Sequence, residues 1–155
     1  MIELSRISAP CAWTGSDLAH SDRWVRELGA REIAELDAAL GLVEVRGLAW
    51  HEITAKDFPL PGLRGLINDI RHELENGCGL TKLRGFPVSG YDEDQRRKLY
   101  YGFGRHVGTP VYQNRCGQLM RVIRDEGAGV GRRYGQIDGG QTPDENRFCH
   151  PTPAP

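Results

Sequence analysis

The stretch LRGLINDIRHELENG, residues 63–77, with LTKLRGFPV, residues 80–88, directly after it, decides the fold class of this chain. Residues 63–76 predict a helix, because apolar side chains recur there at helical spacing: Leu63, Leu66, Ile67, Ile70 and Leu74. Gly77 then stands where a left-handed residue commonly ends a helix. Residues 80–84 predict a strand that Gly85 stops. A helix followed at once by a strand indicates a chain of the α+β class.

The alternation of helix and strand continues towards the C-terminus. Asp92 is predicted to begin a helix, because Gln95 three residues later completes a capping box. Gly108 is predicted to end this helix, whose expected buried stripe is Leu99, Tyr100, Phe103 and Val107. Further strands are predicted over residues 119–124 and 132–137.

Shorter elements are predicted before the deciding stretch. They are a helix over residues 24–28 capped by Asp22, a helix over 33–40 ended by Gly41, a strand over 42–45 closed by Gly47, and a turn-rich segment over 54–61. Helices therefore come first, helix–strand alternation follows, and a β-rich part begins last.

Length and composition suit one globular domain. The chain has 155 residues, of which 39% are hydrophobic and 26% charged, and its net charge is -1. This balance predicts neither a nucleic-acid nor a membrane partner, and the N-terminus lacks the pattern of a signal peptide, so we expect a cytoplasmic protein. The cysteines form no C-x-x-C pair, which favours reduced thiols over a zinc site: Cys11, Cys78, Cys116 and Cys149.

Three groups of residues, in this order, carry a resemblance. They are AWTGSDL (12–18) with EIAELDAAL (32–40), then FPLP (58–61) with ELENG (73–77) and LRGFPV (83–88), and last YGFGRHVGTPV (101–111) leading into Gln113 and Asn114. Together they resemble the TauD/TfdA-like dioxygenases, which use Fe(II) and 2-oxoglutarate. The resemblance covers about residues 12–148, and the order of the three groups is more specific than any one of them.

The resemblance implies a double-stranded β-helix, or jelly roll, with helices packed on its outside. It also implies Fe(II) held by a His-x-Asp or His-x-Glu pair and a distant His, and a late Arg that binds 2-oxoglutarate. Three ligands on one face of the iron leave the other positions for 2-oxoglutarate and oxygen. A complete enzyme of this kind hydroxylates a small organic metabolite.

In that family the His-x-Asp pair follows the segment with which this sequence ends. His150 is followed by Pro151 and Thr152, with no acid two residues on. We therefore expect residues 1–148 to be the N-terminal part of one such domain, an incomplete jelly roll with no catalytic residue and no metal ligand. We expect this chain to bind neither Fe(II) nor 2-oxoglutarate and to be inactive by itself.

The last residues, 149–155, are rich in proline and break the composition of the chain. One coding of the segment from Phe148, with a single C restored after that codon, continues as Phe-Leu-Ser-Ser-Tyr-Ala-Arg-Thr. This hypothesis predicts a frameshift, or a pseudogene, directly after Phe148. A jelly roll cut at its first strands leaves open edges and an apolar helix face without a partner, so we expect a marginally stable, aggregation-prone product.

The resemblance implies that Gln113 and Asn114 lie near the substrate mouth and contact substrate. The alternative, which stays open, is that these amides satisfy backbone groups at a strand end. Among the histidines, His20-Ser21-Asp22 has the spelling of a metal pair, but Asp22 better suits a helix cap. His106 is expected to complement the dipole at a helix C-terminus.

Two other functions remain open from the sequence. In the first, the chain is a non-catalytic helical module that binds a protein through the face formed by Leu63, Ile67, Ile70 and Leu74. In the second, it is a small α+β protein unrelated to the dioxygenases. Neither the substrate nor the oligomeric state follows from the sequence.

Overall fold

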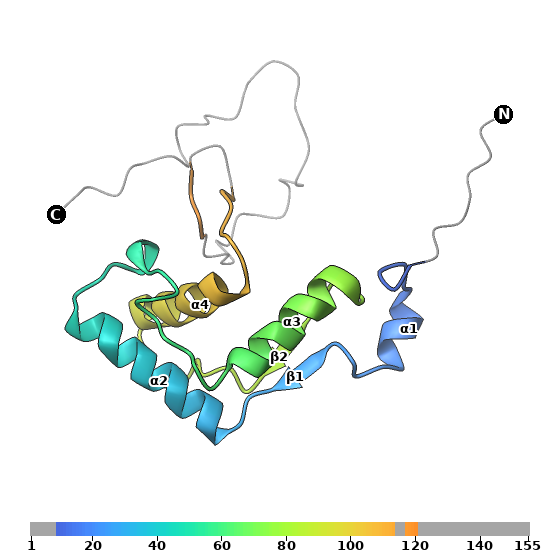
Figure 1. Ribbon diagram of the computed structural model, residues 1–155, viewed down its shortest axis with the longest axis horizontal. Coiled ribbons are helices and arrows are strands. Elements are labelled where there is room, and N and C mark those ends of the chain that lie inside the picture. The colour runs from blue at the N-terminus through green and yellow to red at the C-terminus, as the bar shows by residue number, and fades with distance from the viewer. Residues whose placement is uncertain (1–8, 114–116, 121–155) are drawn as a thin grey trace, which may run out of the picture. The chain divides into compact units, whose positions relative to one another are not determined.

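The computed structural model describes residues 9–113 and 117–120. The chain divides into two compact units, Met1–Thr109 and Pro110–Pro155. The described elements belong to the first unit (Figure 1) and run in this order: α1 (Gly15–Ala19), β1 (Val25–Glu27), α2 (Ala30–Val45), the 3-10 helix η1 (Trp50–Glu52), α3 (Arg64–Asn76), β2 (Lys82–Arg84) and α4 (Glu93–Val107). Within the described ranges, no helix is long and apolar enough to cross a membrane.

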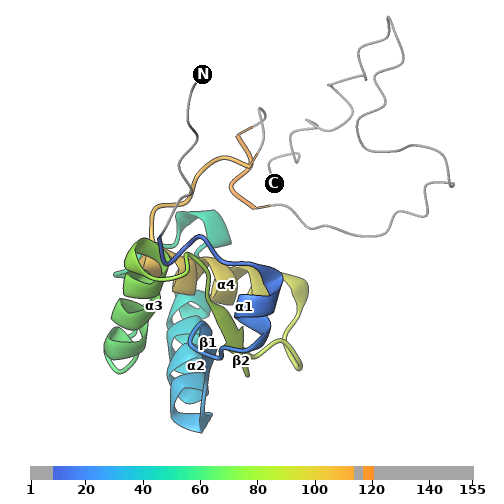
Figure 2. The ribbon, with the colours of Figure 1, turned by 90° about the vertical axis from the view of Figure 1, so that its right-hand side faces the viewer.

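β1 and β2 lie side by side as a parallel pair, with Arg26 opposite Leu83 (Figure 2). The predicted strand at 80–84 is confirmed in its last three residues, whereas the predicted helix at 24–28 is wrong. Five residues with three apolar side chains fit either a helix or a strand, and hydrogen bonds from β2 decide between them. The backbone N–H of Leu28 donates to the carbonyl of Arg84 at 2.9 Å, which extends the pairing beyond β1.

Gly85 ends β2 as predicted, and its conformation shows why a glycine stands there. Its φ is +75°, a left-handed value that residues with a side chain rarely adopt. A Cβ on Gly85 would also lie 2.8 Å from the carbonyl oxygen of Leu28. The absence of a side chain therefore lets the chain turn away while it stays close to β1.

α2 is longer than the sequence predicts. Gly41 lies inside this helix, so the predicted break at Gly41 and the predicted strand at 42–45 are both wrong. The buried face explains the continuation, because its members recur at helical spacing through the glycine: Leu36, Ala39, Leu40 and Val43. The helix ends just before Gly47, which has a φ of +64°, so Gly47 follows a helix and not the predicted strand.

α3 confirms the predicted helix over residues 63–76, with Leu63 as its N-cap. Two details differ. Gly77 has a φ of −99° and is not left-handed, whereas Gly79 is, at +80°. Leu74 is 39% exposed, and Glu73 takes a buried position instead. The Glu73 carboxylate accepts the N–H of Cys78 at 2.9 Å and so satisfies a backbone donor just past the helix.

α4 packs against α2, α3 and η1, and therefore connects the helices of the first unit. The capping box of Asp92 and Gln95 is confirmed. Leu99 and Phe103 are buried as predicted, but Tyr100 is 67% exposed. Tyr101 is buried in its place, because its ring packs edge-on against Trp50 of η1 with the ring centroids 5.3 Å apart.

Phe58 is the largest fully buried side chain of the core. It comes from the turn-rich segment that the sequence predicts over residues 54–61, and its ring lies against Gly102 in the middle of α4. The other large, fully buried side chains among the described residues lie in or next to the surrounding helices: Leu36, Val43, Ile53, Leu63 and Leu99. The core therefore forms where α2, α3 and α4 meet around one aromatic ring.

The second unit is described only over residues 110–113 and 117–120. The backbone N–H of Gln113 donates to the carbonyl of Gln118 at 2.6 Å, and Gly117 has a φ of +73°. Residues 119 and 120 are not part of a strand. The rest of the predicted strand at 119–124, the predicted strand at 132–137 and the tail at 149–155 lie outside the described residues.

Candidate functional site

Gln113 is the one member of the predicted substrate pair that the structure describes. It is exposed, and its side-chain amide donates to the carbonyl of Val111 at 3.0 Å. This contact is of the kind expected if the amide satisfies the local backbone, but it leaves the amide oxygen free to face a ligand. Asn114 lies outside the described residues. A role for either residue in substrate binding stays a prediction.

His20-Ser21-Asp22 has the spelling of a metal pair but does not sit in a strand. His20 is the C-cap of α1, and its Nδ1 lies 2.7 Å from the carbonyl oxygen of Ser16. Because the next element is the strand β1, Asp22 is not the predicted helix cap. Across residues 9–113 and 117–120, no three His, Cys, Asp or Glu side chains gather in a way that fits a metal ion.

His106 lies in the last turn of α4, as the helix-dipole interpretation requires. The structure adds a contact that the sequence did not predict. Its Nε2 lies 2.6 Å from the carbonyl oxygen of Phe58, and because a carbonyl can only accept, Nε2 carries the proton. His106 therefore ties the end of α4 to the segment that enters the core.

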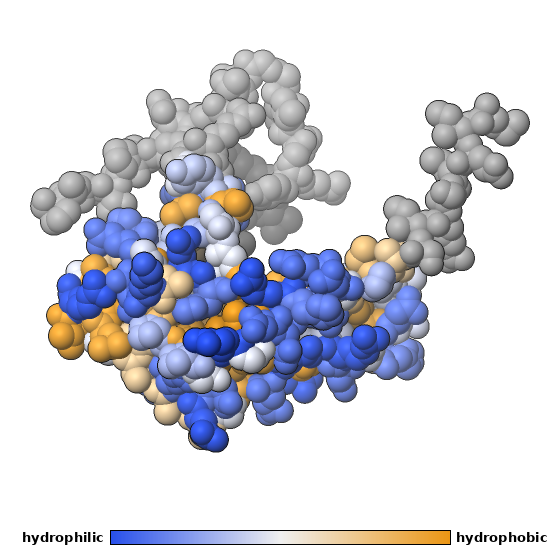
Figure 3. All heavy atoms as spheres, viewed as in Figure 1, coloured by the Kyte–Doolittle hydropathy of each residue, from blue (hydrophilic) through white to orange (hydrophobic). Residues whose placement is uncertain are grey.

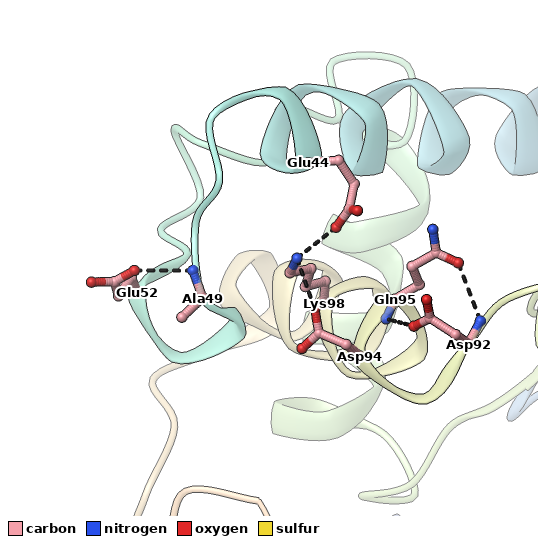
Figure 4. Close-up of polar contacts among 7 residues, drawn as sticks. All are labelled: Glu44, Ala49, Glu52, Asp92, Asp94, Gln95 and Lys98. Atoms are coloured by element: carbon pink, nitrogen blue, oxygen red, sulfur yellow. Dashed lines mark hydrogen bonds and ion pairs between the residues drawn. The ribbon is translucent and has the colours of Figure 1, made fainter. Parts of the chain in front are cut away.

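Lys98 joins α2 to α4 (Figure 4). Its ammonium lies 2.5 Å from a carboxylate oxygen of Glu44 and 2.8 Å from one of Asp94, and its side chain is only 10% exposed. Hydrogen bonds from the ammonium to Asp94 and then to Glu44 raise the pKa of Lys98. Lys98 therefore stays charged at neutral pH and acts as a structural cation, since both of its partners neutralise it.

A hollow of about 410 Å³ opens between the segment after Phe58, α3 and the end of α4. Three of its lining residues lie on one side of α3 at positions i, i+4 and i+7: Arg64, Asn68 and Arg71. The remaining lining is Pro59, Leu60, Pro61, Ile67 and His106. This cluster was not predicted from the sequence, although the polar i, i+4, i+7 spacing within the predicted helix is a signal for it.

Most of the apolar face on which the protein-binding module depends is buried. Leu63, Ile67 and Ile70 are at most 5% exposed, because they pack into the core, whereas Leu74 is 39% exposed. Exposed apolar side chains lie elsewhere. Leu42 and Val45, 51% and 89% exposed, stand near the C-terminal end of α2, where Figure 3 shows hydrophobic side chains gathered on the surface.

Comparison with known proteins finds similarity to a synthase. No protein-family model matches the chain. FR-33289 synthase from Streptomyces rubellomurinus is 28% identical over 131 residues. The match includes 83% of this chain but only 39% of the synthase, so the chain spans well under half the length of the curated relative it matches. The chain is thus similar to part of a biosynthetic enzyme.

Proposed function

We propose that this chain is the N-terminal part of a TauD/TfdA-like oxygenase that uses Fe(II) and 2-oxoglutarate to hydroxylate a small organic metabolite. The observation that carries the proposal is the similarity to a synthase over 83% of the chain. The three ordered groups of residues, from AWTGSDL at 12–18 to YGFGRHVGTPV at 101–111, support the same family. The match covers only 39% of the synthase, which supports the proposal that this chain is one part of a longer enzyme.

The described residues do not fit an iron site, because no suitable group of His, Cys, Asp or Glu gathers among them. We therefore assign them no step of the oxidation. Their part in the proposed enzyme is to form the helical layer around α4. Gln113 and Asn114, in the second unit, are proposed to contact the substrate. We also propose that the complete enzyme has a jelly-roll fold.

The experiment that tests the proposal begins with the coding DNA through and beyond the codon for Phe148. We expect another frame to continue with a His-x-Asp pair, a later His and a late Arg. The protein from the joined frames should convert 2-oxoglutarate to succinate in the presence of Fe(II) and oxygen. The chain of 155 residues, tested in parallel, should not.

A variant of the joined protein with Ala for the His of the pair is the control, and it should lose succinate formation. The proposal fails if no frame beyond Phe148 carries the pair. It also fails if the joined protein folds, binds Fe(II) and leaves 2-oxoglutarate unchanged across a panel of small organic acids.

A further inference from the structure

The hollow beside α3 is positively charged. Of its eight lining residues, Arg64 and Arg71 carry positive charges and none carries a carboxylate. Both arginines are exposed, so their guanidinium groups reach solvent and any ligand in the hollow. A concave surface with one sign of charge raises the local concentration of oppositely charged solutes. The hollow therefore favours an anion.

The arginines have no carboxylate partner within residues 9–113 and 117–120. The ion pairs found there belong to Arg46, Arg97 and Lys98. Glu35 reaches the segment just before α3, but its carboxylate already accepts the backbone N–H of Gly62 at 2.7 Å. Two exposed guanidinium groups without an acid are consequently free to bind an anion from solution.

The spacing on α3 suits one small ligand. Seven residues of helix place the backbones of Arg64 and Arg71 about 10 Å apart along the axis. Asn68 lies between them on the same side of the helix, so two guanidinium groups and an amide line the same hollow. Guanidinium forks match carboxylate and phosphate oxygens in pairs, which a single ammonium does not.

One wall of the hollow is apolar. Pro59, Leu60 and Pro61 form it, and the proline rings restrict the backbone there. His106 lies at the end of this wall, with its ring oriented by the hydrogen bond to the Phe58 carbonyl. A ligand with an anionic head and a short apolar body would therefore find a partner for each part.

We propose that this hollow is a binding site for a small organic anion with a carboxylate or phosphate head, held by Arg64, Asn68 and Arg71. All of the residues that line the site belong to the first unit, and binding there needs neither iron nor 2-oxoglutarate. The inference goes beyond the proposed function, and either can fail without the other.

The test is titration of the full chain, labelled for two-dimensional NMR, with inorganic phosphate and separately with citrate, against sodium chloride at equal ionic strength. We expect the signals of residues 64, 68, 71 and 106 to move in a saturable way. Arg64→Gln with Arg71→Gln should weaken binding at least about tenfold, since losing even one charge-assisted hydrogen bond corresponds to such a factor. Preference for phosphate or for citrate identifies the head group.

The matched control is Arg31→Gln with Lys56→Gln, which removes the same charge from exposed residues that do not line the hollow. This pair should bind as the parent does. Equal weakening by both pairs, or no weakening by the first, overturns the proposal and leaves only general surface electrostatics. If the double variant does not fold, the single exposed substitution Arg71→Gln decides the question. If signals are too broad, equilibrium dialysis of labelled phosphate gives the same comparison.

Discussion

Gly102 is the residue where α4 comes closest to the core. A Cβ added there would lie 2.5 Å from Cγ of Phe58, a ring that is fully buried and cannot move aside. Overpacking of this kind costs about 1–3 kcal/mol, while alanine is better than glycine in a helix by about 1 kcal/mol. We expect Gly102→Ala to lower the free energy of unfolding by up to roughly 2 kcal/mol, because the clash outweighs the propensity.

Gly104 provides the matched control for Gly102 in the same helix. It is exposed, and an added Cβ would meet nothing within 4 Å. Gly104→Ala should therefore raise the free energy of unfolding by about 0.5–1 kcal/mol. Urea unfolding followed by tryptophan fluorescence measures both variants. Equal effects of the two substitutions would contradict the close packing of Phe58 on α4.

Glu73 makes stability depend on pH in the acid range. The hydrogen bond from the backbone N–H of Cys78, helped by the positive charges of Arg23 and Arg26, lowers the pKa of Glu73 below 4.5. A lowered folded-state pKa means that the stabilisation is fully present above about pH 4.5 and is lost as the pH falls through the folded value. Glu73→Gln should cost about 1–2 kcal/mol at pH 7 and progressively less as the pH falls through the folded-state pKa of Glu73.

Glu75, exposed on the same helix, is the control for Glu73. Glu75→Gln should leave the pH profile of the urea midpoint close to that of the parent. A profile for Glu73→Gln that runs parallel to the parent from pH 7 to pH 3 would show that the carboxylate does not stabilise the end of α3.

At the scale of the element, α4 depends on its first turn. The Asp92 carboxylate accepts the N–H of Gln95 at 2.8 Å, and the Gln95 side chain accepts the N–H of Asp92 at 3.1 Å. Loss of an N-cap of this kind costs about 1 kcal/mol. We expect Asp92→Ala to lower the unfolding free energy by about that amount, and Asp92→Asn to lower it much less.

The measurement for Asp92 is urea unfolding of the whole chain, because α4 packs against α2, α3 and η1 and its first turn does not act alone. Amide exchange in the first turn of α4 should speed up in Asp92→Ala before other helices respond. A loss as large in Asp92→Asn as in Asp92→Ala would show that charge, rather than the capping hydrogen bond, matters there.

At the scale of the whole molecule, the exposed apolar side chains near the end of α2 resemble a protein–protein interface. Leu42 and Val45 lie one turn apart and are 51% and 89% exposed. Exposed apolar surface drives association. We expect the chain to self-associate at rising concentration, and Leu42→Lys with Val45→Lys to shift its elution towards the monomer in size-exclusion chromatography.

Val88→Lys, at another exposed apolar position, is the control and should leave elution unchanged. The expectation of marginal stability rested partly on the face around Ile67 and Ile70, which the structure buries. It stays a prediction for the chain as a whole. A parent that is monomeric at every concentration and unfolds in one sharp thermal transition would contradict both expectations.

Local signals in the sequence were enough to predict α3, α4 with its N-terminal cap, and the end of β2 at Gly85. Each depends on residues three or four apart, or on one backbone conformation that glycine alone adopts readily. Gln113 and Asn114 came instead from a resemblance, and the described contacts of Gln113 leave that role untested.

Only the tertiary structure decided the elements and sites that depend on distant partners. Val25–Glu27 is a strand because Lys82–Arg84 supplies its hydrogen bonds, and α2 passes through Gly41 because its buried face continues to Val43 against the rest of the core. The hollow at Arg64 and Arg71 likewise needs the wall after Phe58 and the end of α4. The physical reason is the same throughout: short segments have several conformations of similar free energy, and contacts between residues far apart in the chain select one.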